Sequence, residues 1–69
     1  MNLTHEQLMA GARSVASEQM EGIIVDPDAP LVIVPPGEDG GWRASRDGCH
    51  TTMKESDIII RALVLGALA

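Results

Sequence analysis

Four residues in the second half of the chain could bind an anion: Arg43, Arg46, Thr51 and Thr52. They stand just before the segment in which the last helix is expected to begin. Free backbone amides and the positive end of the helix dipole favour phosphate or carboxylate at a helix N-terminus, and guanidinium groups add charge-assisted hydrogen bonds. One hypothesis is therefore an oligomer that sequesters a phosphorylated small molecule or a nucleotide. In the simpler interpretation, Thr52 only caps the helix and the arginines are solvated or paired with nearby acids.

Cys49 and His50 are the next candidates, because thiol and imidazole are nucleophiles and metal ligands. They are adjacent, His5 is remote in sequence, and a zinc site would need Asp47 or a second subunit to complete its ligands. A nucleophilic Cys49 would need a base and an oxyanion site, which sequence neighbours rarely provide. A small packing residue is the simpler interpretation of Cys49. We therefore expect no metal, no cofactor and no enzymatic activity.

A Pro- and Gly-rich loop could contact a partner protein through Glu38, Asp39 and Trp42. Trp is enriched at binding hot spots, and carboxylates can meet a basic surface. In the alternative, Trp42 lies in the core, since it is the only aromatic residue of the chain, and the acids serve solubility. The glycines of this loop match no phosphate-binding fingerprint, because a strand rather than a helix should follow them.

The C-terminal segment is apolar around nearly its whole circumference, whereas a helix on a monomer surface should show one apolar stripe. Its twelve residues from 58 to 69 would reach only about 18 Å as a helix, well short of the roughly 30 Å of a hydrocarbon core, so no membrane span is expected. We expect a helix contact across a homodimer instead. The predicted interface residues are Ile59, Ile60, Leu63, Val64, Leu65 and Leu68.

Capping patterns in the sequence predict two helices, one at each end of the chain. Thr4 and Gln7 form a capping-box pattern, and Gly22 is a natural residue after a helix end, so a helix is predicted at about 5–21. Thr52 and Glu55 repeat the capping-box spacing and predict a second helix at about 53–68.

Between the helices, β-branched runs and breaker residues predict strands at about 22–26, 31–35 and 41–46. The run from Leu31 to Val34 does not alternate with polar residues, so it is expected to be the central strand, covered on both faces. The predicted fold class is α+β in the order α-β-β-β-α, with the strands as an antiparallel meander. Residues 1–69 form a single domain in this prediction.

The composition excludes some classes of function. The chain has 69 residues, a net charge of −5 and a pI near 4.6, the wrong sign for binding nucleic acid through counterion release. It has one Cys and neither Phe nor Tyr, so a disulfide, a Cys-rich metal site and an aromatic cluster are all missing from so small a core. A homo-oligomer is therefore expected. The first six residues do not resemble a signal peptide, and a cytoplasmic location is expected.

These features together suggest a non-enzymatic, acidic interaction protein that works as a homodimer. Small acidic chains of this kind are common among accessory proteins of phages and other mobile elements, which block a host protein by occluding its surface. This is the first functional hypothesis, and the phosphorylated-ligand binder is the second.

Overall fold

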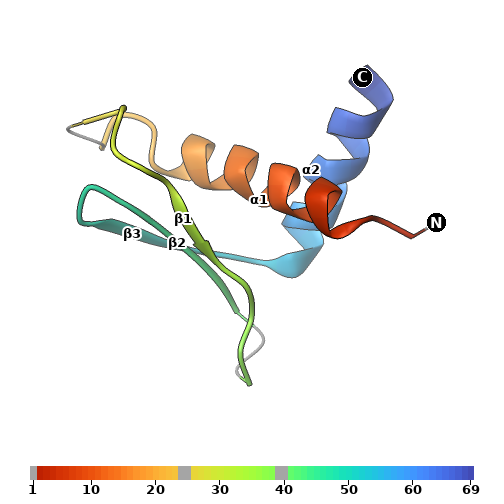
Figure 1. The fold of residues 1–69 in the computed structure, drawn as a ribbon, viewed down its shortest axis with the longest axis horizontal. Coiled ribbons are helices and arrows are strands. Elements are labelled where there is room, and N and C mark those ends of the chain that lie inside the picture. The colour runs from red at the N-terminus through yellow and green to blue at the C-terminus, as the bar shows by residue number, and fades with distance from the viewer. Residues whose placement is uncertain (1, 24–25, 39–40) are drawn as a thin grey trace.

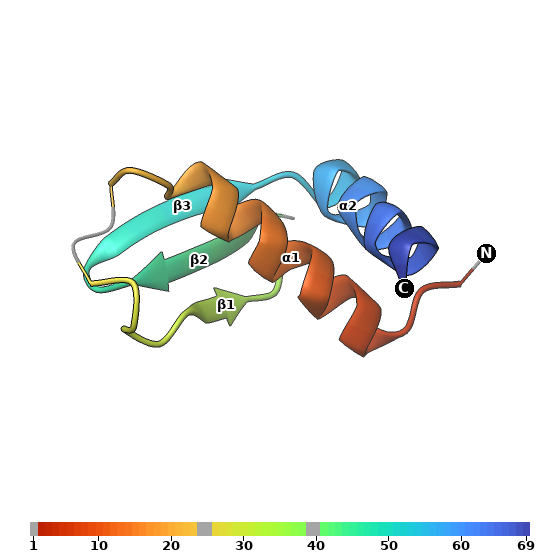
Figure 2. The same ribbon diagram turned by 90° about the horizontal axis from the view of Figure 1, so that it is seen from above.

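The computed structural model describes residues 2–23, 26–38 and 41–69. The elements in chain order are α1 (His5–Gln19), β1 (Val32–Val34), β2 (Trp42–Arg46), β3 (Cys49–Met53) and α2 (Glu55–Leu68). The strands form one antiparallel sheet in the order β1-β2-β3. Helix α1 lies across one face of this sheet, and α2 leaves the end of β3 and crosses α1 (Figures 1 and 2). The predicted α-β-β-β-α order is confirmed, whereas the homo-oligomer stays a prediction.

Helix α1 begins as the sequence predicts. The Thr4 hydroxyl accepts from the backbone N–H of Gln7 at 3.1 Å, and the Gln7 side chain accepts from the backbone N–H of Thr4 at 2.8 Å. This is a complete capping box, which satisfies two donors that the helix itself leaves free. The helix ends at Gln19, two residues earlier than predicted, and Gly22 follows with a φ of +82°.

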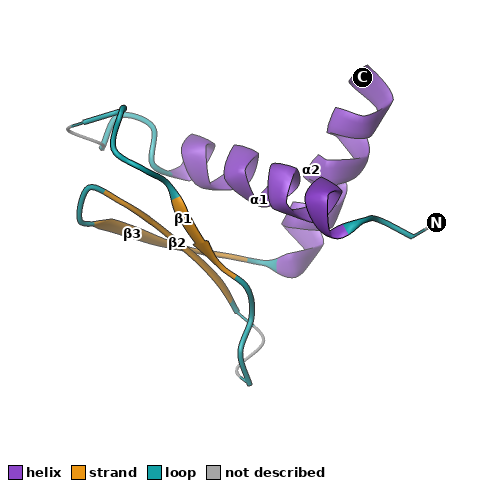
Figure 3. Ribbon diagram, viewed as in Figure 1, coloured by secondary structure: helices purple, strands orange, loops and turns teal. Residues whose placement is uncertain are grey.

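Two of the predicted strands are present, but the strand predicted at 22–26 is not confirmed. Gly22 and Ile23 lie in a turn, Asp26 lies outside any strand, and Ile24 and Val25 lie outside the described residues. The third strand is β3 instead, in a segment predicted to be a loop and the start of a helix (Figure 3).

The reason for this difference is the turn between β2 and β3. Asp47 and Gly48 both have positive φ, 49° and 81°, which is the conformation of a two-residue type I′ hairpin turn. Asp-Gly is a preferred sequence for that turn. The turn pairs Arg46 with Cys49, and it thereby extends Cys49–Met53 as the partner strand of β2.

Strand β1 is an edge strand, so its predicted central position was wrong. The centre is β2, which pairs with β1 on one side and with β3 on the other. Val32 and Val34 are 52% and 40% exposed on the face away from α1. An uninterrupted apolar run predicts cover on both faces, but in the described part of the chain a helix lies across only one face of the sheet (Figure 1).

Helix α2 begins at Glu55, after the N-cap residue Lys54, and has no side-chain cap. The predicted capping box of Thr52 and Glu55 is therefore wrong. Thr52 pairs with Arg43 inside the sheet, and that pairing keeps its backbone extended rather than at the helix boundary.

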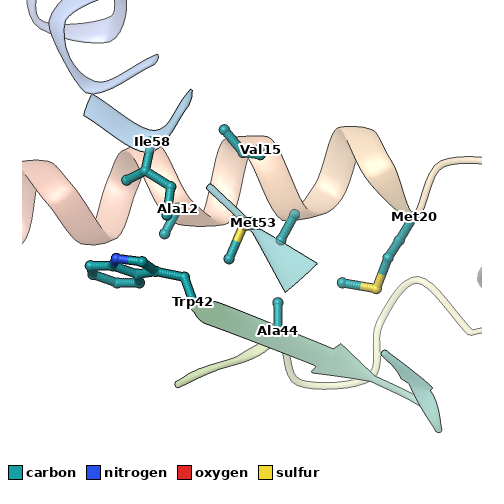
Figure 4. Close-up of a cluster of buried hydrophobic side chains, with 8 residues drawn as sticks. Ala12, Val15, Met20, Trp42, Ala44, Met53 and Ile58 are labelled. Carbon is teal, nitrogen blue, oxygen red and sulfur yellow. The ribbon is translucent and has the colours of Figure 1, made fainter. Parts of the chain in front are cut away.

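The core lies between α1 and the sheet (Figure 4). Trp42 is 4% exposed, and its indole lies beside Ala12 and Ile58, while Met20 closes the opposite end. The buried apolar residues are Ala12, Val15, Ala16, Met20, Trp42, Ala44, Met53, Ile58 and Ala62. Four of these nine are alanines, so the elements approach closely but bury little side-chain volume.

The two helices touch where both have small residues. A Cβ added to Gly11 would lie 2.7 Å from the carbonyl oxygen of Ile58 and 3.0 Å from the Cβ of Ala62. Only glycine permits this separation, because the nearest obstacle is backbone. Ala62 of α2 is thus in contact with α1 of its own chain.

Candidate functional site

The most prominent surface feature is the side of α2 that faces away from α1. Helix α2 turns the stripe of Ile58, Arg61, Ala62 and Leu65 inward: Ile58 and Ala62 are buried, and the other two are half-buried. Successive residues of a helix are 100° apart, so the opposite side carries Ile59, Ile60, Leu63, Val64 and Ala67. We call these five residues the free face of α2. All five are exposed and none has a hydrogen-bonding side chain.

The predicted interface residues are mostly on this free face. Ile60 is 60% exposed, Val64 48% and Leu63 41%, and Ile59 lies beside them at 37%. Leu68 is exposed at the side of the helix near its end. Leu65 is the exception, because it is half-buried and lines a cleft with Thr4, Gln7 and Ala10 of the start of α1.

Arg61, the only charged side chain between residues 58 and 69, is turned toward α1 and away from the free face. Its guanidinium donates to the Ser14 hydroxyl at 2.8 Å and to the Glu18 carboxylate at 2.5 Å. The structure thus pairs Arg61 with Glu18 of α1 rather than with Asp57, one turn earlier in α2. The free face is therefore uncharged as well as apolar.

The accessible surface area of the chain is larger than that of a typical folded monomer of its mass. It amounts to 4735 Å² for a chain of 7.3 kDa. A folded monomer of that mass typically exposes about 4,200 Å². The excess is about 500 Å², compared with the roughly 800 Å² that one partner buries in a standard interface.

The four predicted anion-binding residues do not converge at a helix N-terminus. They lie on β2 and β3, whose side chains alternate between the two faces of the sheet. Arg43 and Thr52 are exposed on the face away from α1, whereas Arg46 and Thr51 lie on the α1 side. Thr51 donates to the Gln19 side chain of α1 at 2.5 Å, so it joins the sheet to that helix.

The N-terminus of α2 is also unsuited to an anion. Its first turn holds Glu55 and Asp57, whose carboxylates already occupy the positive end of the helix dipole. The structure therefore does not support an anion-binding site at the N-terminus of α2.

Cys49 and His50 are separated by the same alternation. Cys49 is half-buried on the α1 side, where its Sγ lies 4.0 Å from the backbone oxygen of Ile23. His50 is exposed on the other face. In the described part of the chain, no group of three or more His, Cys, Asp or Glu residues could hold a metal ion.

The three predicted partner-binding residues have different environments. Trp42 is buried in the core, so its ring cannot contact a partner protein. Glu38 is exposed, and Asp39 lies outside the described residues. Among the described residues, no group accepts a hydrogen bond from the indole Nε1 of Trp42, so burial of this ring carries a desolvation cost.

Sequence proximity groups His50 with Cys49, but the structure places it beside two of the candidate anion-binding residues. It lies directly opposite Ser45, on the same sheet face as Arg43 and Thr52. The Asp47-Gly48 pair was the signal that could have found it, since a two-residue turn fixes the register of the hairpin and so places His50 on that face.

Comparison of the chain with protein-family models, with curated proteins and with solved structures finds no match. Among the helices of the described residues, none combines the length and the apolarity that crossing a bilayer requires. The function must therefore be inferred from the geometry.

Proposed function

We propose that this chain is a non-enzymatic interaction protein that works as a homodimer joined through the free face of α2. The observation that carries the proposal is the exposure of Ile59, Ile60, Leu63 and Val64 on one side of a helix whose other side already packs on α1. Contiguous exposed apolar surface of this kind marks interaction sites on soluble proteins.

A second copy is the partner that suits this surface best. The free face is aliphatic throughout and has no polar group to be matched, and permanent homodimer interfaces are more apolar than those of transient complexes. Each copy carries a net charge of −5, so two copies must meet on an uncharged surface. The free face meets this condition because Arg61 is held against Glu18 on the opposite side of α2.

The small core also favours self-association. Only Met20 and Ile58 stand out among the fully buried side chains by volume, and much of the core is alanine. Single cores of this size rarely contribute more than about 3–5 kcal/mol of net stability. Burial of the free face against a second copy would add apolar burial at roughly 25 cal/mol per Å².

In this proposal the dimer acts on a host protein, as an accessory protein of a phage or other mobile element would, by covering a basic surface. The exposed acids Glu21, Asp26, Asp28 and Glu38 lie in the segments that flank the sheet and remain accessible when α2 is covered. Complementary charge would speed association and select the partner. The environments of Cys49 and His50, on opposite sheet faces, favour this non-enzymatic role.

Sedimentation velocity tests the dimer with variants that add one carboxylate to the free face. Ile60→Asp and Val64→Asp are expected to convert the dimer to a monomer that keeps its helical circular dichroism, because a charge would otherwise be buried without a partner. Ser17→Asp is the matched control, since it adds the same charge on an exposed position of α1 and should leave the dimer intact.

Leu65 is unsuited to this test, because it is half-buried beside α1 and a carboxylate there would disturb the fold itself. A parent protein that sediments as a folded monomer throughout the micromolar range would refute the proposal. Dissociation of the Ser17→Asp control would also count against it, since the effect would then be general charge repulsion.

A further inference from the structure

The sheet face that α1 leaves uncovered has a composition unlike the rest of this acidic chain. We call it the open face of the sheet, and its strand residues are Val32, Val34, Arg43, Ser45, His50 and Thr52. None of them is acidic, although the chain has ten Asp and Glu residues. They supply a guanidinium, an imidazole and two hydroxyls, all of which can donate hydrogen bonds.

The register brings these donors together. Arg43 lies opposite Thr52, and Ser45 lies opposite His50. The two-residue turn makes Arg46 and Cys49 a hydrogen-bonded pair, so alternation makes both open-face pairs of the non-hydrogen-bonded kind, in which side chains are closest. These residues line a shallow pocket of about 290 Å³ together with Val34.

Arg43 and Arg61 differ in their partners. Arg61 binds a carboxylate and a hydroxyl of α1. In contrast, within residues 2–23, 26–38 and 41–69, no side chain forms a hydrogen bond or ion pair with the Arg43 guanidinium. An unpaired guanidinium beside several donors is the arrangement by which proteins recognise phosphate.

We propose that the open face of the sheet binds the phosphate group of a small molecule. Arg43 donates to the phosphate oxygens through its fork of N–H groups, and the Thr52 hydroxyl donates from the neighbouring strand. His50 and Ser45 line the same pocket and offer further donors. Val34 borders the pocket and gives the organic part of the ligand an apolar surface, so the ligand class is a phosphate monoester with an apolar or aromatic body, such as a nucleoside monophosphate.

This site does not depend on the homodimer. The open face and the free face of α2 belong to different elements, and α1 and α2 both lie away from the open face (Figure 1). A folded monomer could therefore bind phosphate, and a dimer could fail to bind it. The two proposals can fail separately.

Amide-detected NMR titration tests the proposal with three probes: adenosine monophosphate, inorganic phosphate and adenosine. Adenosine monophosphate is expected to shift the amide signals of β2 and β3 around Arg43, His50 and Thr52, with inorganic phosphate weaker at the same residues and adenosine without effect. Arg43→Gln should weaken the binding of adenosine monophosphate by tenfold or more, and Thr52→Val by a few-fold, because each removes a donor without changing the strand.

Arg13→Gln is the matched control, since it removes one exposed cation from α1, away from the sheet. It should leave the affinity for adenosine monophosphate unchanged. Equal weakening by Arg13→Gln would mean unspecific attraction to charge and would overturn the proposal. Binding of adenosine as tight as that of its monophosphate, or no shift at millimolar concentrations of any probe, would overturn it as well.

Discussion

Helix α1 and helix α2 have almost the same length, but the more apolar of the two, α2, buries fewer residues. Helix α1 carries apolar residues on one side only and buries Gly11, Ala12, Val15 and Ala16. Helix α2 is apolar nearly all the way round and buries only Ile58 and Ala62. The apolar content of a helix therefore does not measure how much of it the chain itself can cover.

The position of each helix explains the contrast. Helix α1 lies between the sheet and α2, so two elements share its apolar side (Figure 2). Helix α2 crosses α1 near Gly11 and then diverges from it (Figure 1), and a Cβ added to Gly66 near its end would meet no atom within 4 Å. Helix α2 therefore keeps large apolar side chains exposed, whereas α1 exposes none of that size.

The largest expected effect is a difference in unfolding free energy between a substitution on the buried side of α2 and a substitution on its free face. Ile58→Ala should cost about 2–5 kcal/mol of unfolding free energy, because Ile58 is fully buried. Ile60→Ala should cost the isolated chain little, since Ile60 is 60% exposed. Urea unfolding followed by circular dichroism measures both effects.

Protein concentration sharpens this test. In a homodimer, stability rises with concentration by mass action. The loss caused by Ile60→Ala should therefore grow as the parent protein becomes more dimeric, whereas the loss caused by Ile58→Ala should be present at every concentration. Concentration-independent values for both variants would remove the distinction between the two sides of α2.

An intermediate effect is expected where the helices cross. Gly11→Ala should destabilise the protein by about 1–3 kcal/mol, because the new methyl group would meet the backbone of Ile58, and strain from overpacking is of that size. Thermal unfolding gives the measurement. Gly66→Ala is the control, and it should stabilise by up to about 1 kcal/mol, since that position is open and alanine favours the helix.

The smallest effect concerns the ion pair that joins the two helices. Arg61→Met keeps most of the aliphatic stem and removes the bonds to Ser14 and Glu18. The loss should be at most about 1 kcal/mol, because Glu18 is largely exposed and solvent screens the pair. A double-mutant cycle with Glu18→Gln measures the coupling, and a coupling of several kcal/mol would show that this pair, rather than small-residue packing, holds α2 in place.

The fold was predictable where short-range signals decide the structure. Thr4 and Gln7 predicted the start of α1, and their reciprocal hydrogen bonds confirm it. Thr52 and Glu55 have the same spacing, yet they form no cap, because Thr52 pairs with Arg43 in the sheet. Identical local patterns thus gave opposite outcomes, and tertiary pairing decided between them.

The candidate sites were predictable only in part for the same reason. Ile59, Ile60, Leu63 and Val64 were identified as surplus apolar surface from helical spacing alone, and they are exposed together on one side of α2. The placement of the candidate anion-binding residues could not be predicted, because Thr51 and Thr52 lie on β3, in a segment predicted to be a loop and the start of a helix. The Asp47-Gly48 turn would have corrected this reading, since it fixes which residues share a sheet face.

The sequence by itself determined the two helices, the cap of α1 and the excess of aliphatic residues near the C-terminus, because these depend on residues within a few positions of one another. Only the tertiary structure decided which strand is central, which side of α2 packs on α1, and that Trp42 is interior. Those outcomes depend on strand register and on the close approach at Gly11, which join residues far apart in the chain and follow from the sterics of the assembled elements.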